Sequence, residues 1–203
     1  IKYVMLSRHY ASDVDILDSD YQIAETHLYY FYKTLEKMQK FIEEYNGDAT
    51  KEMFDSEFSK EIVTKFIKVM DEDFNTSAAV ANLHNIFKYA NAIMNEAKKS
   101  TRQVTANTLA KMVKDIRKVY SVLGLLEQNP EKFIIELKEK YLKKLQISPK
   151  DIEIFIEERA NAKKNKDYNK ADFIRTELDS KGIILNDTVK GTEWDIKALY
   201  KVF

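Results

Sequence analysis

Residues 151–194 read DIEIFIEERANAKKNKDYNKADFIRTELDSKGIILNDTVKGTEW, and this stretch decides the fold of the C-terminal region. Two charged segments broken at Asn165-Lys166-Asp167 have the pattern of two helices, because turn-forming residues interrupt a composition that favours helix. Gly182 is suited to the position after the second helix, where φ is positive. Two short strands around Val189-Lys190-Gly191 then form a β-hairpin. The stretch therefore predicts a helical hairpin followed by a small sheet.

The apolar residues of this stretch indicate how it packs. We expect the two helices to meet through Ile152, Phe155, Ile156, Phe173, Ile174 and Leu178. Ile183, Leu185 and Trp194 are expected to cover the open end of the hairpin. For Trp194 we favour a position in the core over an exposed one in which the ring stacks on a nucleic-acid base, because a small module needs a large buried ring.

Positive charge gathers at the helix break. The cations are Arg159, Lys163, Lys164, Lys166 and Lys170, and Tyr168 and Asp172 stand beside them. A compact site of this kind can attract a phosphate backbone, stack an unpaired base and recognise a base edge. The sequence therefore suggests nucleic-acid binding at the helix break.

Composition limits the remaining possibilities. The chain of 203 residues has 33 Lys and Arg against 33 Asp and Glu, so nucleic-acid binding must be local rather than driven by net charge. Cys is absent, which excludes disulfides and thiolate metal sites and agrees with a cytoplasmic protein. No apolar run approaches the roughly 18 residues that span a bilayer. The chain begins with Ile and an apolar segment, so we expect it to be part of a longer protein.

Upstream of residue 129, four segments repeat apolar residues at alternating spacings of three and four, the pattern of helices with one buried stripe. Their connections are short, which favours antiparallel neighbours. The predicted fold class is mainly α, with an antiparallel helical bundle followed by a small α+β module. The stripes are Leu28, Phe31, Leu35, Met38, Ile42 and Tyr45; Phe58, Ile62, Phe66 and Val69; Val80, Leu83, Phe87, Ala90 and Met94; and Leu109, Met112, Ile116, Val119 and Leu123.

Helix-capping and helix-breaking residues divide the chain into four predicted parts. Residues 1–18 form a connection, 19–128 the helical bundle, 129–148 a connecting helix, and 149–203 the C-terminal module. Pro130 suits the first turn of the connecting helix. Ser148 and Pro149 suit the N-cap and first position of the next helix.

Residues for catalysis or metal binding are not evident. Four Gly leave no phosphate-cradling loop, and the three His lie far apart without a metal-ligand spacing. Asp71-Glu72-Asp73 could mimic a cation site, but acidic residues before a helix also complement its dipole. We expect no catalytic residue, no metal site and no cofactor in this chain.

Three ordered motifs resemble the cysteinyl-tRNA synthetases, class I aminoacyl-tRNA synthetases. KDYNKADFIRTELDSKGIILNDTVKGTEW, from Lys166 to Trp194, is similar to the C-terminus of that family. MDEDFNTSAA, from Met70, is similar to its MDDDFNTPEAL, and LSRHYAS, from Leu6, to its LS.HYRSP. The family's ATP-binding and zinc-binding motifs lie upstream of these blocks and are absent here.

The resemblance implies that this is the tRNA-binding C-terminal half of a cysteine–tRNA ligase, inactive by itself. The intact enzyme would use ATP and Mg, with Zn, to attach cysteine to its tRNA, as a cytoplasmic monomer without a membrane association. The terminal module would recognise the GCA anticodon. The family motif places base-reading roles on Lys163, Tyr168, Asp172 and Asp187, and we expect the neighbouring Lys164 to contact phosphate.

Each of these residues also has a structural alternative. Lys163 and Lys164 could form a solvated helix face, and Tyr168 could pack in the hairpin core. Asp172 could cap the helix or pair with Arg175, and Asp187 could serve only the turn between the strands. For the whole chain, the alternatives are a helical adaptor that binds protein, or a relative that ligates cysteine to a small amine. Such relatives generally lack the terminal module.

Overall fold

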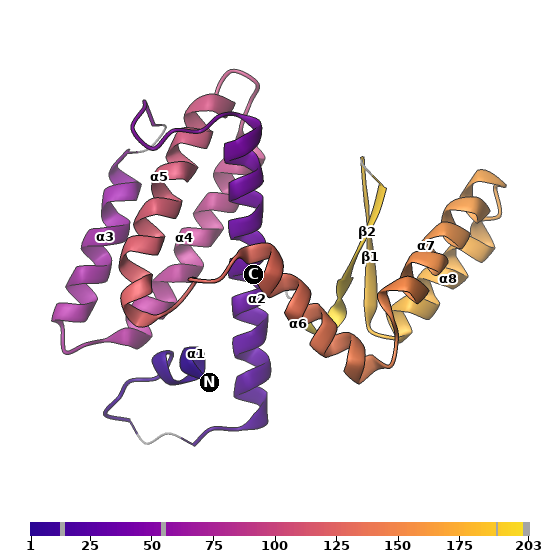
Figure 1. Cartoon of the computed structure of the whole chain (residues 1–203), viewed down its shortest axis with the longest axis horizontal. Coiled ribbons are helices and arrows are strands. Elements are labelled where there is room, and N and C mark those ends of the chain that lie inside the picture. The colour runs from indigo at the N-terminus through magenta and orange to yellow at the C-terminus, as the bar shows by residue number, and fades with distance from the viewer. Residues whose placement is uncertain (13–14, 54–55, 190, 201–203) are drawn as a thin grey trace. The chain divides into compact units, whose positions relative to one another are not determined.

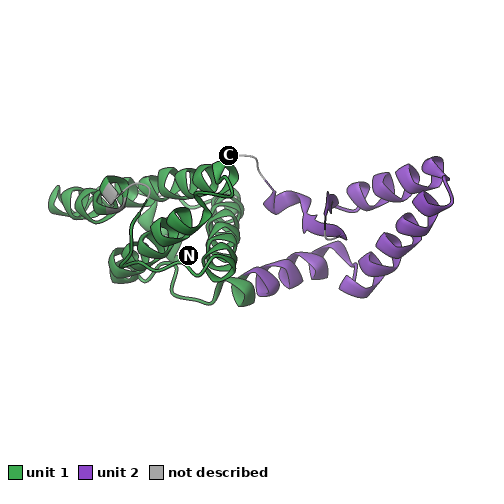
Figure 2. Cartoon of the chain, turned by 90° about the horizontal axis from the view of Figure 1, so that it is seen from above, with its two compact units in different colours: residues 1–133 green, residues 134–203 purple. Residues whose placement is uncertain are grey.

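The computed structural model describes residues 1–12, 15–53, 56–189 and 191–200, which form two compact units, 1–133 and 134–203 (Figure 2). The division falls inside α6, within the segment 129–148 that we expected to connect the domains. The elements in chain order are α1 (Lys2–Leu6), α2 (Asp18–Glu44), α3 (Ser56–Asp71), α4 (Thr76–Glu96), α5 (Arg102–Tyr120), η1 (Ser121–Leu123), α6 (Pro130–Leu145), α7 (Pro149–Lys164), α8 (Tyr168–Ser180), β1 (Ile183–Thr188), β2 (Gly191–Ile196) and η2 (Lys197–Leu199).

The first unit is a bundle of α2, α3, α4 and α5, in which successive helices run in opposite directions (Figure 1). Both α2 and α3 pack against α4 and α5. The centres of the predicted stripes form the core, and Phe31, Phe87 and Met112 are fully buried. The predicted fold class, a helical bundle followed by a small α+β module, is confirmed.

Two of the sequence motifs meet at one end of this bundle. The Tyr10 hydroxyl donates a hydrogen bond to Asp73 Oδ1 at 2.7 Å. Asp73 and Phe74 both have positive φ, and Asn75 caps α4 by accepting from the backbone N–H of Ala78 at 3.0 Å. The acidic run before α4 therefore belongs to a tight turn into that helix. The short helix α1, which follows no long periodic pattern, was not predicted.

The second unit contains the α7–α8 hairpin and the antiparallel pair β1–β2. Ser148 is the N-cap of α7, as predicted, and it also forms a capping box with Asp151: the Ser148 N–H donates to Asp151 Oδ2 at 3.0 Å and Ser148 Oγ accepts from the Asp151 N–H at 3.2 Å. Gly182 has φ of 81°, which confirms its predicted place after the helix. Lys190 of the predicted turn lies outside the described residues.

One predicted packing contact is wrong. Phe173 is 67% exposed, whereas Ala171, Ile174 and Leu178 are buried. These three residues lie at spacings of three and four along α8, so they form its inward face, and Phe173 projects from another side. Ile183 and Leu185 are buried as expected.

A buried amide ties the bundle to the loop after α2. Asn107, on α5, is 3% exposed; its Nδ2 donates to the Glu52 carbonyl at 2.8 Å and its Oδ1 accepts from the Asp48 N–H at 2.8 Å. Without this amide the loop would lose both hydrogen bonds to α5, each of which contributes to stability.

We therefore expect Asn107→Ala to lower the free energy of unfolding by about 1–3 kcal/mol. Denaturant unfolding followed by circular dichroism measures the change. Asn85→Ala, at an exposed position of α4, is the control and should have little effect. Equal stability of the two variants would show that the Asn107 bonds do not anchor the loop.

Candidate nucleic-acid interface

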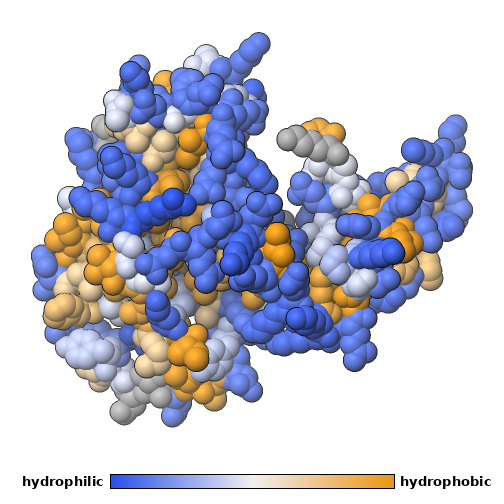
Figure 3. All heavy atoms as spheres, in the orientation of Figure 1, coloured by the Kyte–Doolittle hydropathy of each residue, from blue (hydrophilic) through white to orange (hydrophobic). Residues whose placement is uncertain are grey.

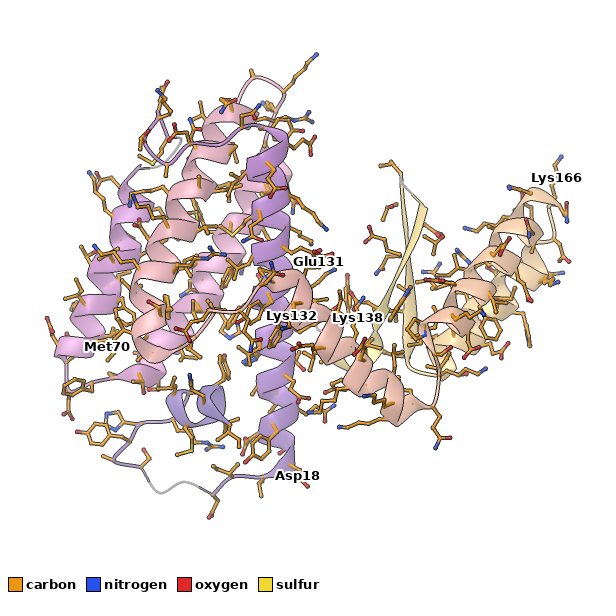
Figure 4. The ribbon with its side chains drawn as sticks, in the orientation of Figure 1. Asp18, Met70, Glu131, Lys132, Lys138 and Lys166 are labelled. Carbon is orange, nitrogen blue, oxygen red and sulfur yellow. The ribbon has the colours of Figure 1, made fainter. Side chains whose placement is uncertain are left out.

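The helix break forms a tight turn at the far end of the α7–α8 hairpin, where Lys166 projects (Figure 4). The Asp167 carboxylate caps α8 by accepting from the Lys170 N–H at 3.0 Å. Lys166 has φ of 59°, a conformation uncommon for a residue with a side chain. The turn therefore presents α7's last residues and α8's first residues together.

Four of the five cations predicted at this turn are exposed: Lys163, Lys164, Lys166 and Lys170. Hydrophilic side chains accordingly cover this end of the hairpin (Figure 3). The fifth cation was misplaced by the sequence argument, because Arg159 is only 4% exposed. Arg159 lies one helical turn before Lys163 and its guanidinium is directed to β1.

Arg159 and Asp187 form a bidentate ion pair. Arg159 Nη1 donates to Asp187 Oδ1 at 2.8 Å, and Nη2 donates to Oδ2 at 2.9 Å. Arg159 Nε is buried and has no hydrogen-bond partner among the described residues. The planar guanidinium matches a carboxylate in this geometry, so the pair fixes the end of β1 against α7.

Two further donors complete the surroundings of Asp187. Lys163 Nζ lies 3.0 Å from Oδ2, and the Thr192 hydroxyl donates to Oδ1 at 2.8 Å. A carboxylate has about four acceptor sites, so the four donors occupy its capacity. The hydrogen bonds from Arg159, followed by those from Lys163 and Thr192, hold the pKa of Asp187 well below its usual range. Asp187 is thus a fixed anion rather than an ordinary turn residue.

Tyr168 and Asp172 remain accessible one turn apart on α8. Tyr168 is 62% exposed, so the alternative in which it packs in the hairpin core is wrong. Asp172 is exposed, and its carboxylate forms no ion pair with a described cation, including Arg175. The pKa of Arg159 is raised, mainly by its hydrogen bonds to Asp187 and in part by the charge of Asp172. A ring and a carboxylate therefore stand free beside the fixed ion pair.

Thr192 was not predicted to belong to the site, and Arg175 was considered only as a partner of Asp172. Thr192 faces Asp187 across the sheet, a register that the short turn between the strands could have indicated. Arg175 lies one turn after Asp172, and its Nη2 is 3.5 Å from the Leu185 carbonyl.

Trp194 is half-buried, with Lys138 Nζ 4.3 Å from its ring centre, so it packs against α6.

Comparison with known proteins shows similarity to one family of enzymes. A family model described as the DALR domain matches residues 65–127, which include α4 and α5. The cysteine–tRNA ligase of Geotalea uraniireducens is 34% identical over 97% of this chain and 42% of its own length. Those of Geobacter metallireducens and Acinetobacter baumannii strain SDF are 35% and 34% identical over 97% and 96% of this chain. This chain is a homologue of the cysteine–tRNA ligases.

The resemblance carried by the three motifs is thereby confirmed. The chain spans about two fifths of the length of these cysteine–tRNA ligases. The DALR match lies in the first unit, so it does not include the residues around the helix break.

Among the described residues, no group of three His, Cys, Asp or Glu could hold a metal ion. None of the described helices has the length and apolar character needed to cross a membrane.

The low pKa of Asp187 makes an acid-dependent contribution to stability. The unfolded Asp binds a proton near pH 4, whereas the folded carboxylate resists protonation. The stability that Asp187 contributes is therefore present above about pH 4 and is lost as the pH falls toward its folded-state pKa.

We expect Asp187→Asn to lower the unfolding free energy at pH 7 by about 1–3 kcal/mol, because Arg159 loses its charged partner. The variant should also lose less stability than the wild type between about pH 4 and pH 2. Denaturant unfolding across this pH range tests both points. Asp179→Asn, in the more exposed pair with Lys197, is the control and should change little. Parallel pH profiles for wild type and Asp187→Asn would contradict the role of this carboxylate.

Proposed function

We propose that this chain is the tRNA-binding part of a cysteine–tRNA ligase and that the end of the α7–α8 hairpin recognises the GCA anticodon. The supporting observation is that Tyr168 and Asp172 are exposed one turn apart, among cations, in a homologue of these enzymes. Sequence-specific RNA recognition uses unstacked bases, aromatic rings and hydrogen bonds to base edges. This small surface offers an aromatic ring for stacking and a carboxylate for hydrogen bonds to a base edge.

The proposed roles follow from accessibility. The Asp172 carboxylate can accept hydrogen bonds from the guanine N1 and N2 donors, and the Tyr168 ring can stack on an unpaired base. Lys164 has no ion pair with a described carboxylate and extends into solvent, so it suits a phosphate contact. Base contacts and backbone contacts would thus come from neighbouring residues of one hairpin.

We assign Asp187 and Lys163 a linked role. With four donors around it, Asp187 can accept from a base only if one donor leaves. Lys163 is more easily displaced than Arg159, because its side chain is 43% exposed whereas that of Arg159 is 5% exposed. In this proposal Asp187 positions Lys163 for RNA, and direct base recognition by Asp187 requires Lys163 to turn away.

The intact enzyme would attach cysteine to its tRNA with ATP, acting as a cytoplasmic monomer. Cysteine, ATP, Mg and Zn would be bound by sequence that the relatives have beyond the matched region. The chain described here would hold the tRNA and would not activate cysteine alone. Its own residues contribute positioning of the tRNA rather than a chemical step.

Asp172→Asn should reduce the preference of the chain for the GCA anticodon over a tRNA with an altered anticodon by about 1–3 kcal/mol. Removing a carboxylate acceptor leaves the guanine donors poorly matched, while the exposed position should leave folding intact. Fluorescence titration of both tRNAs measures the ratio of dissociation constants. Glu157→Gln, which removes an exposed charge from α7, is the control. An unchanged ratio in Asp172→Asn would remove Asp172 from the recognition set.

Tyr168→Ala should weaken tRNA binding by about 1–3 kcal/mol, the contribution of one stacked base. Tyr168→Phe retains the ring and should bind nearly as well as the wild type. Phe173→Ala removes a ring of similar exposure from the same helix and is the matched control. If Tyr168→Ala and Phe173→Ala weaken tRNA binding equally, the two rings act only as exposed apolar surface and Tyr168 does not stack on a base. That result would favour the helical adaptor that binds protein.

A further inference from the structure

Helix α5 carries the strongest concentration of positive charge among the bundle helices. It has five basic residues and one acidic residue, although the chain as a whole is neutral. Two of the five have partners on the protein: Arg102 lies over the Tyr45 ring, and Lys111 pairs with the buried carboxylate of Asp115. The remaining three are Lys114, Arg117 and Lys118.

These three residues, which we call the α5 basic stripe, share one face of the helix because they are spaced by three and four. All three are exposed, and none forms an ion pair with a carboxylate among the described residues. Asp115 does not neutralise them, since it is 4% exposed and paired with Lys111. The stripe therefore presents three uncompensated charges to solvent.

Folding alone does not account for this arrangement. Like charges three or four residues apart on a helix repel one another and destabilise it slightly. The C-terminal helix dipole can offset this for Arg117 and Lys118 in the last turn, but its effect fades before Lys114. By contrast, the three lysines of α3 are each paired with a glutamate: Lys60 with Glu57, Lys65 with Glu61, and Lys68 with Glu72.

We propose that the α5 basic stripe binds the phosphate backbone of the tRNA, outside the anticodon. Exposed Lys and Arg side chains contact phosphates without recognising sequence, so the stripe would add affinity and not anticodon preference. It lies inside the segment matched by the DALR domain and in a different unit from the helix break. This inference rests on the proposed tRNA-binding function and adds a second contact surface to it.

The test compares two triple variants that remove the same charge. Lys114→Ala/Arg117→Ala/Lys118→Ala removes the stripe, and Lys60→Ala/Lys65→Ala/Lys68→Ala removes the paired lysines of α3. Each chain is titrated with labelled cysteine tRNA at several salt concentrations. Loss of the stripe should reduce the slope of log K against log salt by about two to three, since each phosphate contact contributes nearly one. The α3 variant should keep nearly the wild-type slope.

Three further readouts separate the possible outcomes. The stripe variant should unfold at a temperature no lower than that of the wild type, because the like charges are removed. Its affinity ratio for GCA and altered anticodons should equal that of the wild type. Equal slopes in the two triple variants, or an altered anticodon ratio, would overturn the stripe proposal. Loss of binding to polyglutamate with unchanged tRNA binding would also overturn it, in favour of an acidic protein partner. If the wild-type chain does not bind tRNA at all, the proposed function itself fails.

Discussion

A buried guanidinium is the constraint on which the second unit depends. Arg159 is 4% exposed, and a charge in that position requires a partner with good geometry. The partner is the carboxylate of Asp187, near the end of β1, which accepts two hydrogen bonds from the guanidinium. The sheet cannot move away from α7 without leaving this charge unpaired. Thr192 and Lys163 converge on the same carboxylate, so β2 and the end of α7 are fixed by the same requirement.

This constraint separates a fixed part of the site from an accessible part. Asp187 is surrounded by donors, while Tyr168, Asp172 and Lys164 lie outside that set on exposed positions. A surface whose support is already ordered loses less conformational entropy when it binds. The arrangement suits recognition of a flexible RNA loop, because the scaffold is held before the RNA arrives and only exposed side chains need to adjust.

Local sequence rules predicted most of the fold, since helix periodicity, the Ser148 cap and the Gly182 position depend on neighbours in the chain. The five-residue helix α1 was missed because it is too short for a periodic signal. Phe173 and Arg159 were misplaced for a different reason. Hydrophobicity suggested that Phe173 is buried, and charge suggested that Arg159 is exposed. The burial of each residue depends instead on whether it lies on the inward face of its helix, and Arg159 does whereas Phe173 does not. The Arg159–Asp187 pair joins residues 28 positions apart, so only the tertiary structure reveals it.

Chemical footprinting of cysteine tRNA bound to the intact chain would test whether the end of the α7–α8 hairpin recognises the anticodon. We expect the three anticodon nucleotides to lose reactivity when the wild-type chain binds and to regain it in the Tyr168→Ala/Asp172→Asn double variant. Other protected nucleotides should stay protected in that variant, because the backbone contacts remain. Unchanged anticodon reactivity at saturating wild-type protein would contradict recognition of the anticodon by the end of the α7–α8 hairpin.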